Sequence, residues 1–439
     1  MSDFNFTMRF SGLIVFLLAG LGSSARGAEI PGGSAMHFAG FGADTLGGRG
    51  GRILKVTNLN AGGAGSLRAA LESAGSRIVV FEVGGIIDWR KETVTITNGR
   101  LTLAGETAPS PGITIIRGSI LVEAPDLIIR HIRVRLGDGG DLKTPNWEAD
   151  SISTNGPKVK NVLFDHVSTS WSIDENLSLS GPREKDGTSS FVTIRNCIIA
   201  EGLDKSTHPK GPHSKGTLIH DFVHDVAIVG NFYAHDFNRN PFLKPNSTVF
   251  QANNLIYDPG SAAMHFAYVP NEYAVIPHLM LPPQLTSIGN VVRLGRSSAP
   301  RLTSAFIGVG KLYQRDNLFY DQTGALAWNG TSGDRLRLAD EKVQMVNEPM
   351  LAPKNFTPLP SSLTEAYVLK NAGARPKDRD SVDRRIVQDY RDRRGKVIDS
   401  QDEVGGYPKS ASNQRKLDVP ENPMEVDAWL ANYLKAVEY

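Results

Sequence analysis

The sequence predicts an all-β fold, a right-handed parallel β-helix whose short strands wind into stacked coils. Three observations lead to this prediction. Pairs of short β-rich runs recur with a polar residue between them, as in "NVLFDHVSTSW", "DVAIVGNFYAH" and "LTSIGNVVRLG". The 439 residues include 44 glycines and 25 prolines, which favours many tight turns over long helices. No single repeat can bury its own apolar face, so the repeats must stack on one another.

The polar residue inside each repeat gives the period of the coils. Aligned repeats carry a polar residue every 23 to 36 residues, a typical solenoid spacing, at His131, His166, Asn196, Asn231, Asn254, Asn290 and Asn317. We expect these residues to form one column, because asparagine tolerates a left-handed bend and its amide can bond the equivalent residue one coil away. A β-sandwich is the alternative. It predicts Asn-Gly turns between matched strands, and the Asn-Gly pairs here lack regular spacing.

The two ends of the repeat region differ from its middle. "SLRAALESAG", Ser66 to Gly75, has an N-cap serine, apolar residues at helical spacing and a glycine stop, so we expect a short helix that caps the coils. After Met350, "DRDSVDRRIVQDYRDRRGKV" predicts an exposed amphipathic helix with a mixed-charge solvent face. The expected organisation is therefore a β-helix catalytic domain over residues 29–349 and a mixed C-terminal extension over 350–439 that packs on it.

The first 28 residues resemble a secretory signal peptide. Arg9 precedes the apolar run "LIVFLLAGLG", and small residues follow up to Ala28. The run is short for a membrane-spanning helix, and a buried N-terminal helix is the alternative. We therefore expect a secreted protein, extracellular or periplasmic, with no membrane attachment after the signal is removed.

The net charge and the cysteine content argue against nucleic-acid or membrane partners and exclude an internal disulfide. The net charge of +2 gives no general attraction for nucleic acid or anionic membranes, so an anionic partner needs a local basic patch. Cys197 is the single cysteine, so the chain has no internal disulfide. It lies in the apolar run "IRNCII", where a packed, inert thiol is expected. A monomer is the default expectation.

Three polar clusters fall on neighbouring repeats. The first is acidic and contains Glu148, Asp150, Asp174 and Glu175. The second is a Pro- and Gly-rich loop with Lys205, His208, Lys210, His213 and Lys215, and the third contains Arg239 and Lys244. Converging carboxylates repel one another unless they share protons or bind a hard cation, for which Ca²⁺ with oxygen ligands is the natural partner. Solvated surface acids, a solvated basic loop and a surface pair between Arg239 and Asp236 are the alternatives.

At these residues the sequence resembles the pectate lyase family, calcium-dependent parallel β-helix enzymes, and within it a bacterial branch. The motifs that carry the resemblance are "GFGADTLGGRGG", "LTLAGETAPSPGITI", "LIIRHIRVRLGD", "FDHVSTSWSIDENLS", "KGPHSKGTLI" and "NFYAHDFNRNPF". They run from about Phe41 to Tyr257, and "IDSQDEVGGYP" returns near the end. Many ordered motifs agree, which makes this signal more specific than any one of them.

The resemblance implies roles for individual residues. Glu148, Asp150 and Asp174 correspond to Ca²⁺ ligands, and Ser178 stands where a further acid is expected, so Glu175 is a candidate replacement. Arg239 corresponds to the catalytic base. Lys215 corresponds to a substrate-binding lysine, Lys244 replaces a second arginine, and Lys210 and His213 are further expected substrate contacts. The implied reaction is β-elimination on polygalacturonate with an alkaline pH optimum.

Other functions stay open at this point. The fold does not determine the sugar, so a lyase for another uronate polymer is possible. A glycoside hydrolase would use paired carboxylates as acid and base or nucleophile, and would leave Arg239 and the lysines without a role. A non-catalytic carbohydrate-binding β-helix is the alternative from another class.

Overall fold

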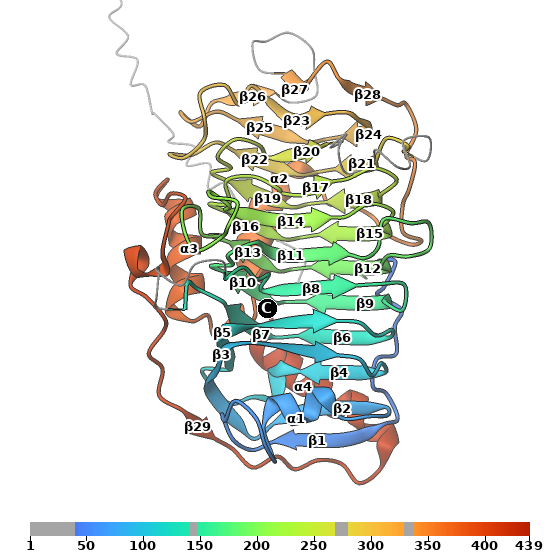
Figure 1. The fold of residues 1–439 in the computed structure, drawn as a ribbon, viewed down its shortest axis with the longest axis vertical. Coiled ribbons are helices and arrows are strands. Elements are labelled where there is room, and N and C mark those ends of the chain that lie inside the picture. Colours follow the sequence, from blue (N-terminus) through green and yellow to red (C-terminus); the bar gives the residue numbers. More distant parts are fainter. Residues whose placement is uncertain (1–39, 140–146, 268–279, 329–336) are drawn as a thin grey trace, which may run out of the picture.

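The computed structural model describes residues 40–139, 147–267, 280–328 and 337–439. It confirms the right-handed parallel β-helix: coils stack from β1 at one end to β28 at the other (Figure 1). The expected signal peptide, residues 1–28, lies outside the described residues.

Three parallel sheets form the faces of the stack. Sheet 1 contains β1 (Arg52–Val56), β2 (Arg77–Phe81), β4 (Leu101–Ala104), β6 (Leu127–Arg130), β9 (Lys160–Asp165), β12 (Ser190–Arg195), β15 (His224–Val229), β18 (Thr248–Ala252), β21 (Gln284–Ile288), β24 (Gly310–Arg315) and β28 (Val343–Met345). Sheet 2 contains β7 (Ile132–Arg135), β10 (Ser168–Ser170), β13 (Ile198–Ala200), β16 (Phe232–Ala234), β19 (Leu255–Tyr257), β22 (Val291–Arg293) and β25 (Leu318–Tyr320).

Sheet 3 carries the candidate site described below. It contains β8 (Ile152–Asn155), β11 (Glu175–Ser180), β14 (Lys215–Ile219), β17 (Phe242–Leu243), β20 (Met264–Phe266), β23 (Ser304–Gly308) and β27 (Arg337–Ala339). The long strands β3 (Val83–Ile96) and β5 (Ile113–Val122) belong to both sheet 2 and sheet 3. Two pairings are antiparallel: β26 (Leu326–Trp328) with β25, and β29 (Asn413–Gln414) with β3.

Stacked aliphatic side chains fill the interior. In sheet 1, one register position places fully buried residues above one another through the coils, at Leu101, Leu127, Val162, Val192, Val226, Val249, Leu285 and Leu312. Each such side chain contributes about 1.5–3 kcal/mol by leaving water. A chain without disulfides is therefore held by this core and by the hydrogen-bond ladders between coils.

The bend between sheets 1 and 2 differs from the expected single column. Strand register pairs Asn196 with Gly230 and places Asn231 one position later, so the bend has two adjacent columns. Residues of the first column have left-handed φ, as at His131 (+57°) and Asn196 (+50°). In the second column each asparagine amide donates to the next coil, over 2.9, 2.8 and 3.0 Å, along Asn231, Asn254, Asn290 and Asn317.

Cys197 takes the position of the second column one coil below Asn231. Its backbone N–H donates to Asn231 Oδ1 over 2.8 Å, and its side chain is buried. Burial raises the pKa of the Cys197 thiol, so the thiol is protonated and packed, as the sequence suggested.

The N-terminal end of the stack is closed by α1 (Leu67–Glu72). Ser66 caps it, because its hydroxyl accepts from the N–H of Ala69 over 3.2 Å, as expected from the sequence. The helix ends before Gly75, which has a left-handed φ of +81° in the following turn. Leu67 and Leu71 face the interior and close the core.

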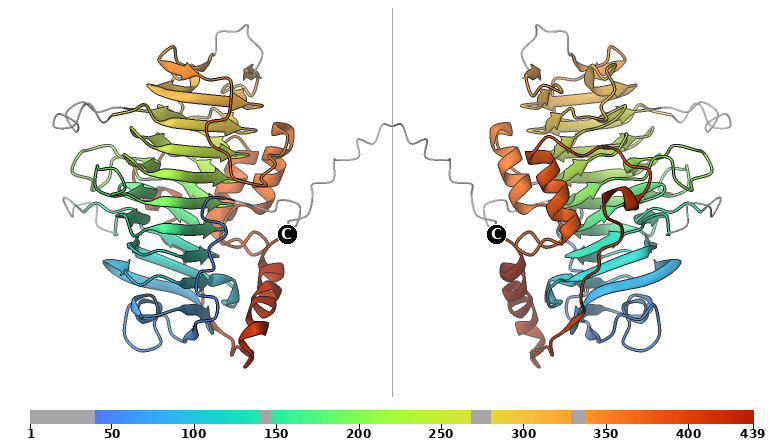
Figure 2. Two further views of the ribbon diagram at one scale, coloured as in Figure 1. Left: turned by 90° about the vertical axis from the view of Figure 1, so that its right-hand side faces the viewer. Right: turned by 90° about the vertical axis from the view of Figure 1, so that its left-hand side faces the viewer.

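The C-terminal segment packs along one side of the stack (Figure 2). It contains α2 (Ser361–Asn371), α3 (Ser381–Arg391) and α4 (Val426–Val437). The apolar side of α3 is buried against sheet 2, at Val382, Ile386, Val387 and Tyr390, so the expected exposed helix is a packed one. Val426 and Leu430 of α4 contact Ile78 and Val80 of β2.

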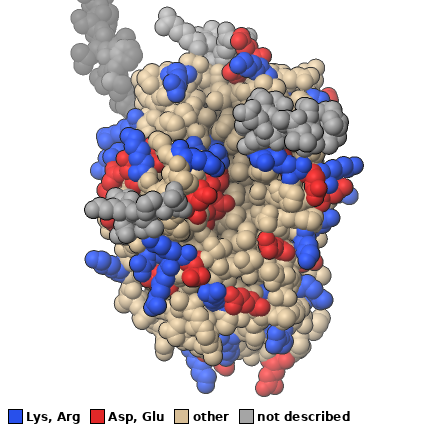
Figure 3. Space-filling model, viewed as in Figure 1, with Lys and Arg blue, Asp and Glu red and all other residues tan. Residues whose placement is uncertain are grey.

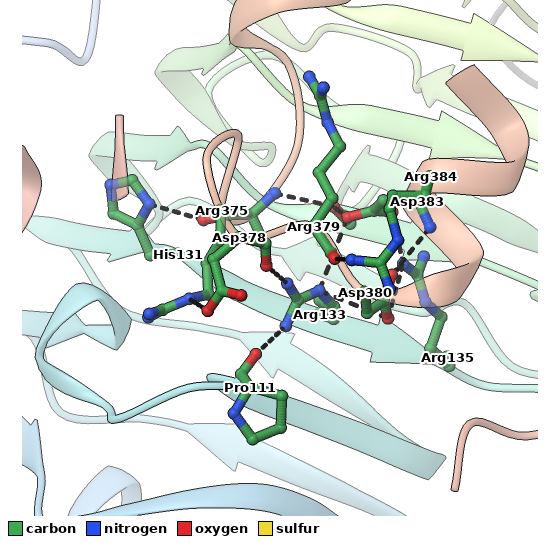
Figure 4. A network of polar contacts seen from close by, with 12 residues as sticks. Pro111, His131, Arg133, Arg135, Arg375, Asp378, Arg379, Asp380, Asp383 and Arg384 are labelled. Atoms are coloured by element: carbon green, nitrogen blue, oxygen red, sulfur yellow. Dashed lines mark hydrogen bonds and ion pairs between the residues drawn. The ribbon is translucent and has the colours of Figure 1, made fainter. Parts of the chain in front are cut away.

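Buried ion pairs fasten α3 to sheet 2 (Figure 4). Arg133 and Arg135 of β7 are fully buried and face Asp380, the N-cap of α3, and Asp383 in its first turn. Arg135 Nη2 lies 2.5 Å from Asp383 Oδ1. Because every buried charge here has a partner, removing one would leave another uncompensated.

Candidate active site on sheet 3

Members of all three polar clusters meet where strands of sheet 3 begin. Glu175 opens β11, Lys215 opens β14, and the two residues are register partners on adjacent coils. Asp150 lies just before β8, so the first acidic pair precedes a strand of sheet 3. In the view of Figure 3, acidic side chains gather near the middle of this face, with basic side chains beside them.

Asp150, Asp174 and Glu175 form a carboxylate cluster. One oxygen of each lies within 4.8 Å of the others. Asp150 is held by the backbone N–H of Glu175 (2.8 Å) and the hydroxyl of Ser178 (2.5 Å). Burial and the neighbouring carboxylate of Asp174 raise the pKa of Asp150 to about 8. Ser178, which stands where an acid was expected, therefore donates to a carboxylate instead of adding one.

The cluster fits a hard divalent cation. Its donors are carboxylate oxygens, which Ca²⁺ prefers. Burial and the adjacent Asp174 both disfavour the charged form of Asp150, and a cation between the three groups would offset both effects. Glu148 continues this cluster towards solvent, with its side chain 47% exposed. The four acids together form an acidic wall.

Arg239 reaches the cluster from two coils away, across the coil that carries Lys215. Its guanidinium contacts Glu175 directly, and it lies over the ring of Phe242 at 5.3 Å. The backbone before it pairs with β14 through a bridge between Lys215 and Asn238, and Arg239 itself has a left-handed φ of +66°. A non-glycine residue takes this conformation at some cost, so the pairing with β14 is needed to hold it.

The alternative pairing of Arg239 with Asp236 is wrong. Asp236 is buried and accepts from the N–H of Gly202 (2.8 Å) and the amide of Asn176 (2.9 Å). Burial raises the pKa of Asp236 well above its usual range. Its carboxyl group supports Gly202 and Asn176 and is not available to Arg239.

The three predicted lysines lie in different surroundings. Lys215 is 8% exposed between Glu175 and the backbone of Asn238, and burial lowers its pKa. Lys244 is 4% exposed at the opposite end of β17 from Arg239, with Nζ 3.3 Å from Asp221 Oδ2. Lys210 is exposed on its loop. The structure thus brings Lys215 to the carboxylates, and places Lys244 and Lys210 elsewhere.

A stacked histidine pair covers the carboxylates from the basic loop. The rings of His208 and His213 are parallel, with centroids 3.7 Å apart. His213 Nε2 lies 2.8 Å from Asp174 Oδ1, and His208 Nε2 lies 2.9 Å from Glu148 Oε2. Burial acts to raise the pKa of Asp174, but the contact with His213 and the charges of Arg239 and His208 together outweigh it, and the pKa is lowered.

The hydrogen bond at Nδ1 of His208 determines the tautomer of its neutral ring. The backbone N–H of Lys210 donates to His208 Nδ1 over 3.0 Å, so in the neutral ring Nε2 carries the proton and faces Glu148 and Asp174. Burial and the adjacent His213 lower the pKa of His208, which favours this neutral form. His208 therefore turns a ring N–H towards Glu148 and Asp174, at ion-pair distance and without hydrogen-bond geometry. The sequence placed it in the loop cluster, but no spacing rule singled it out.

The C-terminal segment contacts two stretches of chain next to the site. Ile398 O accepts from the N–H of Asp204 (2.8 Å), at the start of the histidine loop. Ser400 and Gln401 bond both carboxylate oxygens of Asp138 (2.7 and 2.8 Å), which follows β7. The motif "IDSQDEVGGYP" thus positions the site although it lies far away in sequence.

Comparisons with known proteins show to which proteins this chain is related. No protein-family model matches the chain. A Neosartorya fischeri protein named "Probable pectate lyase C" is 34% identical over 377 residues, which cover 84% of this chain and 79% of that protein. An Aspergillus flavus protein of the same name is 33% identical over 371 residues, covering 84% and 80%. Because these relatives are fungal, the assignment to a bacterial branch stays a prediction.

Solved structures share the fold at low sequence identity. The cedar pollen allergen jun a 1 aligns with a TM-score of 0.54 and 17% identity over 76% of this chain and 92% of its own. A Bacillus subtilis pectate lyase mutant aligns with a TM-score of 0.51 and 14% identity over 76% and 96%. Within the residues that the structure describes, no helix has the length and apolarity needed to cross a membrane.

Proposed function

The chain belongs to the pectate lyase family of polysaccharide lyases, and from this premise we propose that it cleaves polygalacturonate, the de-esterified form of pectin, by Ca²⁺-assisted β-elimination with Arg239 as the base. The observation that carries the proposal is the contact between Arg239 and Glu175 beside Asp150 and Asp174. We also propose that the protein is exported, as its N-terminal sequence suggests, and that it acts as a monomer, which is the default expectation.

Asp150, Asp174 and Glu175 are the residues that would hold Ca²⁺. When bound, the ion would supply a Lewis acid that stabilises the negative charge developing beside the C6 carboxylate of the uronate. Ser178 and the N–H of Glu175 orient Asp150, and His213 orients Asp174. The protein thus presents oriented carboxylate oxygens before any substrate arrives.

Arg239 would take the proton from C5 of the uronate. The C5–H electron pair forms the C4–C5 double bond, the C4–O4 bond breaks, and water protonates the leaving O4. The contact with Glu175 favours the charged guanidinium, which cannot accept a proton. The positive charge of Lys215 favours the neutral form of Arg239 instead. A cation bound to Glu175 would have the same effect. We therefore expect activity to rise towards alkaline pH.

Lys215 is suited to bind the uronate carboxylate. It opens β14 between Glu175 and the coil of Arg239, and most of its side chain is buried. A desolvated ammonium pairs strongly with a substrate carboxylate, because water competes less for either charge. Positioning the carboxylate here would bring C5 towards Arg239.

The test is the ultraviolet absorbance of the unsaturated product from polygalacturonate, with and without a chelator. Arg239→Lys keeps a positive charge and loses the guanidinium, and we expect kcat to fall by at least about 100-fold. Arg301→Lys, at an exposed arginine before β23, is the matched control and should keep wild-type kcat. Near-normal turnover by Arg239→Lys would remove the proposed base.

Product chemistry separates the other uses of this fold. Reducing ends without new absorbance would indicate hydrolysis, and binding without products would indicate a carbohydrate-binding protein. Unsaturated products from a different uronate polymer alone would keep the elimination chemistry and change the substrate.

A further inference from the structure

The charges of α3 are sorted between its two sides. The sequence around this helix nearly balances acids and bases, which predicts a mixed solvent face. In the structure the acids face inward: Asp380 is 8% exposed, Asp383 0% and Asp389 9%. The first two face Arg133 and Arg135 (Figure 4), and Asp389 accepts from Arg385 over 3.1 Å.

The bases of the same segment surround a surface hollow. The hollow has a volume of about 460 Å³ and is lined by Arg379, Ser381, Arg384, Arg385, Val387, Gln388 and Arg391. Its lining includes four arginines and no carboxylate. Arg384 and Arg391 are exposed and seven positions apart, which places them about 10 Å apart along the helix.

Three of these arginines have no carboxylate at ion-pair distance among the described residues. Arg385 is paired with Glu201 at 2.7 Å. Arg379 donates to the carbonyl oxygens of Leu369, Lys370 and Ala372, and Arg384 donates to Arg379 O. Carbonyl oxygens bear no formal charge, and among the described residues no carboxylate oxygen is recorded within 4.0 Å of Arg379, Arg384 or Arg391. The nearby Asp392 is engaged by Gln388 and Arg394.

We propose that this hollow is a second binding site for the acidic polysaccharide, separate from the site of Asp150 and Arg239 where we place the reaction. A guanidinium pairs with a carboxylate through two parallel hydrogen bonds, and a uronate chain carries one carboxylate on every sugar. The identity of the polymer rests on the proposed function. Because α3 packs on sheet 2 and the catalytic residues lie on sheet 3, the two sites bind different stretches of chain.

Two sites on one chain predict a dependence on polymer length. A polymer that reaches both sites binds the second as an intramolecular event, whereas a short oligomer occupies only one. The arginine hollow should therefore strengthen binding of long chains and leave trigalacturonate unaffected.

The experiment compares Arg384→Gln/Arg391→Gln with Arg301→Gln/Arg315→Gln, which removes the same charge from exposed residues near and on β24. Binding is measured on long polygalacturonate and on trigalacturonate, with Arg239→Lys added to each protein to slow cleavage. We expect the α3 variant to bind the long polymer about fivefold more weakly, with trigalacturonate binding unchanged. Unchanged binding of the long polymer, or equal weakening in the control, would overturn the proposal.

The same proteins without the Arg239 change separate this proposal from the function. If none of them releases unsaturated product, the proposed reaction fails, while polymer binding still reports on the arginine hollow. If trigalacturonate binding weakens as much as polymer binding, the arginines belong to the catalytic site and the second site is wrong.

Discussion

Calcium binding should weaken between pH 9 and pH 7 because Asp150 must lose a proton to act as a ligand. Its pKa of about 8 results from burial and from the neighbouring Asp174. At this pKa about 90% of Asp150 is ionised at pH 9 and about 10% at pH 7, so the apparent affinity should fall about tenfold. The window lies above the ordinary pKa of histidine, about 6.5, which limits the contribution of His208 and His213.

Calorimetry measures this linkage directly. Titrations of Ca²⁺ at pH 7, in two buffers with different ionisation enthalpies, should report close to one proton released per ion, and titrations at pH 9 far less. Asp150→Asn should bind weakly at both values and release no proton. Asp221→Asn, which changes a carboxyl paired with Lys244, is the control and should behave as wild type.

Two results would refute the reasoning. The first is an equal affinity at pH 7 and pH 9 with no proton release. The second is a proton release that persists in Asp150→Asn, which would assign the titrating group elsewhere. Either result would mean that Asp150 is ionised without the cation, or is no ligand.

Two further variants test the supports of the site. His208→Phe removes the ring N–H that faces the acidic wall and should weaken Ca²⁺ binding severalfold by calorimetry, whereas His208→Gln keeps an N–H group and should retain most of the affinity; equal losses would contradict a role for this N–H. Asp383→Asn leaves Arg135 short of a counter-charge and should lower the free energy of unfolding by about 3 kcal/mol in denaturant titrations. Asp378→Asn, in a more exposed pair, is its control and should cost less than about 1 kcal/mol.

The repeat spacing predicted the coils, but it combined residues of two adjacent bend columns into a single column. His131 and Asn231 both mark the end of a short strand, and asparagine suits either of two adjacent bend positions. Only the pairing of strands distinguishes the two, since register assigns Asn196 to Gly230 and Cys197 to Asn231. Because the spacing varies from coil to coil, it cannot assign a residue to one of two adjacent bend positions.

The sequence predicted which residues form the site more completely than it predicted how they contact one another. Asp150, Asp174 and Arg239 were candidates from the sequence, and the structure brings them to one place. The sequence could not show that Arg239 contacts Glu175, or that Lys244 lies against Asp221. Such pairs depend on which side chains of stacked coils lie above one another. The loop lengths that determine this stacking are irregular.

The sequence by itself determined the β-rich coils, the capping helix and the kinds of charged group available, because these follow from local patterns of apolar, polar and turn residues. The tertiary structure alone decided which charges are buried together and which reach water. On α3 the acids Asp380 and Asp383 turn inward because fully buried arginines of β7 need counter-charges. That pairing of residues about 245 positions apart leaves the arginines of the helix on the surface, and no local pattern encodes it.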